Sequence, residues 1–165
     1  MYCVPIQSEL ASPNWYAMII LSKLADYGVI VATHLAILSD RQANAAQVAA
    51  ETRLPPATVA KVLKALAHAE LATATRGASG GYRLARPARE ISVAQVVAAI
   101  DGDIGLTQCS VHVDECAHTT YCPTRPHWAA INRAVGEALS AVSLDDMISP
   151  LSFLPAAALA QAAHT

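Results

Sequence analysis

The chain has 165 residues, 54% of them hydrophobic and 15% charged, which suits one small globular domain with one appended element. Alanine supplies much of the hydrophobicity, and the single Phe and two Trp favour closely packed helices over a sheet-based sandwich. The formal net charge of −2 gives the whole chain no attraction to nucleic acid, so a basic surface would have to be local.

The sequence contains no segment typical of a membrane span or a secretory signal. The most apolar stretch, residues 18–38, is interrupted by Lys23, Asp26 and His34, and such groups are costly inside a bilayer. The N-terminus lacks the basic region and cleavage site of a signal peptide. We therefore expect a cytoplasmic protein with no membrane partner. In that compartment its four cysteines indicate metal binding or redox chemistry more than a disulfide framework.

The chain is expected to begin with an extension followed by a core helix. Residues 1–17 contain two prolines and no periodic pattern, so they predict a flexible extension. Met18 is an alternative start, which would leave Cys3 outside any ordered site. Ser22 is a typical N-cap for a helix over residues 23–39 with apolar residues at helical spacing.

Two further helices predict a helix-turn-helix. Residues 45–52 form the first, the Pro55-Pro56 pair interrupts it, and residues 56–69 form the second. The side chains predicted to be buried in the second helix are those of Val59, Val62, Leu63 and Leu66. Those placed to meet the major groove of DNA are Ala57, Thr58, Lys61 and Lys64.

A β-hairpin follows, with strands near residues 71–75 and 82–85 and a glycine-rich tip between them. Glycines allow close backbone approach and Arg76 and Arg83 bracket the tip, which is how a wing contacting a DNA backbone would be built. Tyr82 serves equally well as a packing residue or a sugar contact. The predicted DNA contacts of the wing are Arg76, Ser79, Gly80, Tyr82 and Arg83.

The charges are divided between two consecutive segments. Residues 53–89 hold seven basic residues against one acidic residue, a net charge of +6. Residues 90–123 hold five acidic residues and no Lys or Arg. A basic helix by itself is usually a solvated face, but beside a glycine-rich wing it favours binding to phosphate groups.

The C-terminal half predicts a short helix over residues 92–100, a loop over 101–125 and a long helix over 126–148. The loop lacks any period, and a stretch of this length without structure usually has a function. The long helix carries a broad apolar stripe that a small domain cannot cover, so we expect it to pair with a second copy. Residues 149–165 form an alanine-rich tail.

Three cysteines, Cys109, Cys116 and Cys122, lie in this loop with the spacing C-x6-C-x5-C. Soft sulfur ligands favour an iron-sulfur cluster, zinc or Cu(I), and zinc sites usually contain close C-x2-C pairs that this loop lacks. The pattern therefore indicates an iron-sulfur cluster. Zinc and a metal-free thiol switch remain the alternatives.

A cluster on three cysteines needs one more ligand. The candidates are His112, His118, His127 and Asp26. For each histidine, an ordinary polar position in a loop or on the surface is the more frequent explanation. Asp26 lies in the first turn of a predicted helix, where the helix dipole alone would favour a carboxylate.

Residues 62–66, 70–71 and 76–87 resemble the recognition helix and wing of the Rrf-type family, the winged-helix iron-sulfur regulators related to IscR and NsrR. Residues 21–27 resemble that family's start, and the cysteine loop follows at the expected place. The resemblance extends from Met18 to about Met147. Within the family, the segments around residues 54–64 and 131–147 look most like regulators of the SUF cluster-assembly operon. The resemblance implies a mainly helical fold with a small β-hairpin wing. It consists of a winged helix-turn-helix over residues 18–100 and a long dimerisation helix.

The resemblance also implies the ligand set and the assembly. In some family members an aspartate near the first helix completes the cluster of the partner subunit, and Asp26 matches that position. The IscR branch has a histidine ligand where this chain has Arg125, so a 4Fe-4S cluster is favoured over 2Fe-2S. The ligands expected by this resemblance are Cys109, Cys116, Cys122 and Asp26, with His118 or His127 as outside candidates.

The function expected from this resemblance is a homodimeric, non-enzymatic repressor that binds a palindromic double-stranded operator and controls iron-sulfur assembly genes. One alternative keeps DNA binding but makes nitric oxide or thiol oxidation the signal. Another, from a different class, is a small iron-sulfur electron carrier, which leaves the basic wing unexplained.

Overall fold

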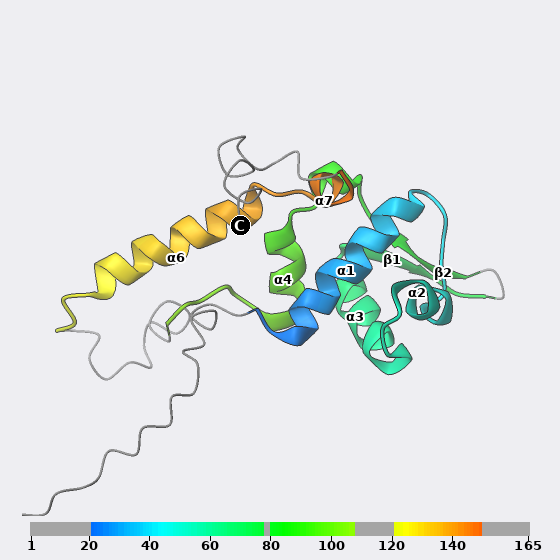
Figure 1. Cartoon of the computed structure of the whole chain (residues 1–165), viewed down its shortest axis with the longest axis horizontal. Coiled ribbons are helices and arrows are strands. Elements are labelled where there is room, and N and C mark those ends of the chain that lie inside the picture. Colours follow the sequence, from blue (N-terminus) through cyan, green and yellow to red (C-terminus); the bar gives the residue numbers. More distant parts are fainter. Residues whose placement is uncertain (1–20, 78–79, 108–120, 150–165) are drawn as a thin grey trace, which may run out of the picture.

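The computed structural model describes residues 21–77, 80–107 and 121–149, and within them it is mainly helical with one two-stranded antiparallel hairpin (Figure 1). The fold class predicted from the sequence is confirmed. In chain order the elements are α1 (Lys23–Leu38), α2 (Ala45–Thr52), α3 (Pro56–His68), β1 (Ala72–Thr75), β2 (Gly81–Leu84), the 3-10 turn η1 (Ala88–Glu90), α4 (Val93–Asp101), α6 (Arg125–Ser140) and α7 (Leu144–Ile148).

The helices begin where the sequence supplies capping groups. The Oγ of Ser22 accepts a hydrogen bond from the backbone N–H of Ala25, which confirms the predicted cap of α1. Asn44 and Ser92 each form a capping box with the Gln three residues later, at the starts of α2 and α4. Proline occupies the start of α3, where its fixed φ suits a first helical turn.

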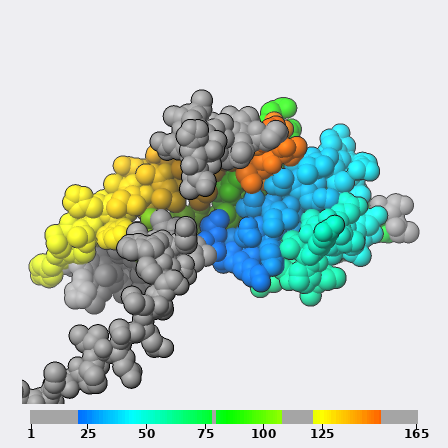
Figure 2. Space-filling view, in the orientation of Figure 1, coloured from blue at the N-terminus to red at the C-terminus, as the bar shows by residue number. Residues whose placement is uncertain are grey.

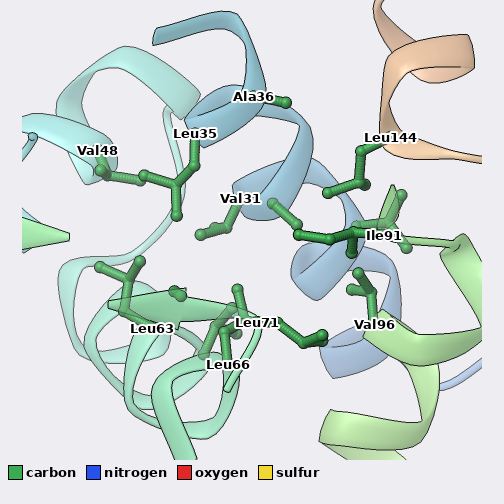
Figure 3. Packing of buried hydrophobic residues seen from close by; sticks show 14 of the residues in the cluster. Val31, Leu35, Ala36, Val48, Leu63, Leu66, Leu71, Ile91, Val96 and Leu144 are labelled. Carbon is green, nitrogen blue, oxygen red and sulfur yellow. The ribbon is translucent and has the colours of Figure 1, made fainter. Parts of the chain in front are cut away.

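The core lies between α1, α3, α4 and the hairpin (Figure 3). Its largest fully buried side chains include Leu35 of α1, Leu63 and Leu66 of α3, and Ile91 before α4. Full burial of one such side chain contributes about 1.5–3 kcal/mol relative to its exposure. This shared core holds α3 and the hairpin in fixed positions.

The helix predicted over residues 126–148 is instead two helices, α6 and α7, so that prediction is wrong in its continuity. Ser143 caps α7, and the side chain of Asp146 completes a capping box. These hydrogen bonds from Ser143 lower the pKa of the Asp146 carboxyl. Backbone hydrogen bonds from Val93 N to Val142 O at 2.9 Å and from Leu144 N to Ile91 O at 2.8 Å turn the chain back into the core.

Helix α6 contacts α4 and packs Leu139 against the core, and from there it extends outward, so its yellow part lies at one end of the molecule in Figure 2. No residue of α6 is buried, and Trp128 and Ile131 are 39% and 44% exposed. Among the described residues, no helix is long and apolar enough to cross a bilayer.

Candidate nucleic-acid interface and cysteine segment

The predicted recognition helix α3 has a buried face and a solvent face. Its buried residues are Val59, Val62, Leu63 and Leu66, as the sequence predicts. On the other side Ala57, Lys61 and Lys64 are exposed, and Thr58 is half-buried. Pro55 at the N-cap has no side chain that can cap the helix. The N–H of Thr58 bonds to the Pro55 carbonyl at 3.0 Å, and in this first turn the N–H of Ala57 stays available for a phosphate oxygen.

The turn before α3 depends on Arg53, whose φ of 56° and ψ of 28° place it in the left-handed region. This residue ends α2, and the Leu54-Pro55 segment then starts α3 directly. Helix α2 packs against α3 and α1. The arrangement of α2, turn and α3 is a helix-turn-helix whose second helix presents its basic side to solvent.

The wing is held to the body by an isolated β-bridge to Ala43. β1 and β2 pair from Ala72 opposite Leu84 to Thr75 opposite Gly81, and β2 pairs on its other edge with Ala43. The two backbone bonds of this second pairing are Tyr82 N to Ala43 O, 2.8 Å, and Ala43 N to Tyr82 O, 3.0 Å. The wing is therefore fixed on both edges at its β2 strand.

The residues predicted to contact DNA from the wing differ in their exposure and in what they pack against. Tyr82 is half-buried and packs against the core, which favours its packing role over a sugar contact. Arg76 is exposed at the end of β1, and the N–H of Gly80 closes the tip onto the carbonyl of Gly77 at 2.9 Å. Arg83 is exposed and lines a pocket beside the C-terminal end of α1. Ser79 lies outside the described residues.

α3 packs against β1, so the recognition helix and the hairpin lie at the same end of the molecule (Figure 1). This brings the α3 residues Lys61 and Lys64 and the wing residue Arg76 to one end of the fold. Basic residues from two separate segments of the sequence thus lie on elements that pack together, and a surface that binds phosphate groups needs such neighbours.

The cysteine segment, residues 101–125, is described at its two ends, over residues 101–107 and 121–125. Cys109 and Cys116, with His112 and His118, lie outside the described residues, and within those residues no three metal-binding side chains converge. Cys122 is half-buried just before α6, and its Sγ lies 3.3 Å from the Oγ1 of Thr124. The hydrogen bonds from Thr124 lower the pKa of the Cys122 thiol, which favours the thiolate that binds metals.

Asp26 and Cys122 lie apart in one chain. Asp26 is exposed in the first turn of α1, on the rim of a pocket of about 370 Å³ that Ile30, Ile37 and Met147 also line. Cys122 lies just before α6, and the first turn of α6 is at the end of that helix away from the core (Figure 1). His127 is exposed on the first turn of α6. Among the described residues, Asp26 and Cys122 do not belong to a common group of three metal-binding side chains.

Residues 21–150 match the model of the Rrf2 family, described as iron-dependent transcriptional regulators. The chain belongs to the Rrf2 family. The matched region includes the helix-turn-helix, the wing, the cysteine segment, α6 and α7. The family is one of transcriptional regulators, a non-enzymatic class.

Sequence relatives of this Rrf2 chain are regulators of the same kind. It is 36% identical over 83 residues to a putative HTH-type transcriptional regulator of Neisseria meningitidis, covering 50% of this chain and 55% of the relative. The match thus spans about half of that relative's length. It is 26% identical over 140 residues to the HTH-type transcriptional regulator IscR of Vibrio atlanticus, covering 85% and 75% of the two chains.

Solved structures confirm the fold of this Rrf2 chain. The global cysteine regulator CymR of B. subtilis superposes with a TM-score of 0.63 at 22% identity, covering 79% of this chain and 96% of that one. IscR of T. potens gives a TM-score of 0.63 at 21% identity, covering 86% and 96%. These likenesses establish a winged-helix architecture.

One residue that the sequence analysis did not single out, Asn132, connects the start of the cysteine segment to α6. Its Nδ2 donates to the carbonyl of Ile104 at 2.9 Å, and its Oδ1 accepts from the N–H of Leu106 at 3.0 Å. Both bonds are partly buried and reach back more than 25 residues along the chain. The detectable signal is a polar residue directly after Ile131 in an otherwise apolar stripe.

Replacing Asn132 with alanine should free the backbone segment 104–106 from α6. Two partly buried backbone groups would lose their partner, which costs about 1–3 kcal/mol of local stability. Hydrogen exchange of the Leu106 amide should accelerate. Asn132→Asp keeps the acceptor for Leu106 but loses the donor, so its exchange should be intermediate, and Arg133→Ala on the exposed face is the control. Unchanged exchange in Asn132→Ala would contradict this role.

Proposed function

We propose that this chain is a homodimeric DNA-binding repressor whose signal is an iron-sulfur cluster and whose targets are cluster-assembly genes of the SUF type. The observation that carries DNA binding is the exposed basic face of α3, with Lys61 and Lys64, next to the wing. Membership of a family described as iron-dependent regulators supports the nature of the signal. The SUF target is supported by the resemblance of residues 54–64 and 131–147 to regulators of that operon.

Exposed apolar surface supports the dimer. Trp128 and Ile131 face solvent along α6, while Ile37, 60% exposed, and Met147, 39% exposed, line the pocket beside α1. A second copy would give each chain surface against which to bury α6. Two recognition helices then meet a palindromic operator, whose half-sites are about 34 Å or a multiple of that apart.

The cluster would be held by Cys109, Cys116 and Cys122 of one chain and Asp26 of the other, with 4Fe-4S favoured. The described donors fit such a group, because Cys122 is accessible with a lowered thiol pKa and Asp26 is exposed. A bound cluster would supply coordination that is sensitive to iron supply and oxidation. Cluster occupancy would then set how the two chains are held together, and with it the distance between the two α3 helices.

The proposal is tested with anaerobically purified full-length protein. Absorption spectra and native mass report the cluster and the dimer together, and titration of a DNA fragment from upstream of its own gene reports binding with and without cluster. A colourless protein whose DNA affinity ignores cluster loading would overturn cluster sensing.

Asp26→Ala should weaken cluster retention and dimerisation together, because one side chain would serve both. The half-life of the cluster absorption measures cluster retention, and the native mass at decreasing protein concentration measures dimerisation. Asp103→Ala removes another exposed acidic residue and should change neither. If Asp26→Ala loses neither cluster nor dimer, the fourth ligand lies elsewhere.

The lowered pKa of the Cys122 thiol also favours a second candidate, in which thiol oxidation or nitric oxide is the signal on the same DNA-binding scaffold. Native mass spectrometry after exposure to peroxide or to a nitric oxide donor separates the candidates. A covalent adduct at Cys122 in cluster-free protein, with altered DNA affinity, supports the thiol signal. A small electron carrier would show neither DNA binding nor this coupling.

A further inference from the structure

A second pocket, separate from the one beside Asp26, lies between the end of α1, the strand β2 and helix α7. Its volume is about 410 Å³, within the range of about 300–1,000 Å³ typical of small-molecule sites. Ser39 and Asp40 line it after α1, and Arg83 and Arg86 line it from β2 and the following turn. Asp145 and Ile148 of α7 complete it.

Four charged groups line this pocket without pairing with one another. Arg83 and Arg86 come from β2 and the turn after it, Asp40 comes from the turn after α1, and Asp145 comes from α7. Among the described residues, the ion pairs involve other side chains, and Arg86 makes only a long bond of 3.4 Å to the carbonyl of Glu90. The pocket therefore presents both signs of charge to one cavity.

The end of α1 adds to the negative side of the pocket. This helix has 16 residues and no basic residue in its last turn, so the negative end of its dipole has no cation from its own sequence. A ligand ammonium placed there would be stabilised by the dipole and by Asp40. The guanidinium groups of Arg83 and Arg86 match a carboxylate, which arginine binds through two parallel hydrogen bonds.

The turn that positions Asp40 is strained. Ser39 has a φ of 57° and a ψ of −119°, and the N–H of Arg41 bonds to the carbonyl of Leu38 at 3.2 Å. These angles are those of the first central residue of a type II′ turn, where glycine is favoured. Non-glycine residues in such conformations cluster at ligand sites, where the strain positions a group for its task.

We propose that this pocket binds a small zwitterion, a free amino acid, with its carboxylate on Arg83 and Arg86 and its ammonium on Asp40, Asp145 and the end of α1. Leu84 and Ile148 supply an apolar wall for the side chain of the ligand. A simple anion would meet the two aspartates, and a simple cation would meet the two arginines. Only a ligand with both charges satisfies both sides.

The site is placed to influence the wing. Arg83 belongs both to this pocket and to the predicted DNA contacts, so the ligand and the DNA backbone compete for one guanidinium. Ligand binding should therefore weaken DNA binding, and DNA should weaken ligand binding by the same factor, typically about 5–150-fold. This coupling rests on the proposed DNA binding, whereas ligand binding itself does not.

The test uses full-length protein and each of the twenty common L-amino acids as probes. At least one should raise Tm by roughly 5–10 °C at a hundredfold excess over its Kd. The corresponding amine without the carboxylate, and the acid without the amine, should not. No shift with any amino acid, or an equal shift with the singly charged analogues, would overturn the site.

Matched variants locate the effect. Asp145→Asn and Arg86→Gln should abolish the shift, while Asp103→Asn and Arg89→Gln, which lie outside the pocket, should keep it. A shift that survives both pocket variants would overturn the assignment. DNA titrations with and without the amino acid measure the coupling, and an unchanged affinity would overturn the regulatory role. Cluster absorption is recorded on the same samples, so a failure of cluster sensing is seen separately.

Discussion

Replacing Leu144 with alanine should lower the free energy of unfolding by about 2–5 kcal/mol, the usual cost of deleting a fully buried leucine side chain. Leu144 is 0% exposed although it starts a helix of only five residues near the end of the described chain. It lies in the core beside Ile91 (Figure 3), and its N–H donates to the Ile91 carbonyl at 2.8 Å. Urea unfolding of the full chain measures the change.

Ile148 provides the matched control, because it lies on the same helix but is 40% exposed. Ile148→Ala should cost clearly less than Leu144→Ala, because Ile148 is already 40% exposed in the native state. If Leu144→Ala were no more destabilising than Ile148→Ala, α7 would not be part of the winged-helix core. An unchanged m-value in both variants would show that the effect is on stability rather than on the compactness of either state.

The N-terminal helices could be predicted from local signals. Ser22 caps α1 and the two prolines at residues 55 and 56 start α3, because these residues act on the backbone next to them. The buried face of α3 followed from the helical period alone, since the core lies on one side of it. Such features depend on a few neighbouring residues and do not require contacts with distant segments of the chain.

The break between α6 and α7 could not be predicted with the same ease. The apolar period continues through Val142, and residues 141–143, where the helix breaks, contain neither glycine nor proline. The local signal was Ser143 with an acidic residue three positions later, a variant of the capping box. Two long-range backbone bonds to Val93 and Ile91 decide the turn, and no periodic pattern encodes them.

The roles of single side chains at the candidate sites were harder still. Tyr82 packs on the core because β2 also pairs with Ala43, almost 40 residues earlier. Asn132 has its role because it bonds to the backbone of residues 104–106, which follow α4. The pocket beside Arg83 requires α7 to fold back, which the sequence analysis did not foresee. These residues have functions that depend on contacts between distant segments.

Gly81→Ala should displace the wing and reduce DNA affinity more strongly than loss of any single surface charge. A Cβ at this position would lie 2.7 Å from both the carbonyl carbon and the oxygen of Ala43, which are backbone atoms that cannot rotate away. The clash falls on the pairing that fixes β2 to the body, where Tyr82 and Ala43 exchange two hydrogen bonds. Relieving it means separating β2 from Ala43 and exposing Tyr82.

Overpacking of this kind costs about 1–3 kcal/mol, and here the cost falls on the hairpin that carries Arg76. Thermal unfolding and DNA titration of the same sample measure both effects. Thr73→Ala, on the exposed side of the neighbouring strand, is the control and should leave both nearly unchanged. If Gly81→Ala bound DNA as tightly as Thr73→Ala, the position of the wing would not matter for recognition, and α3 alone would carry the affinity.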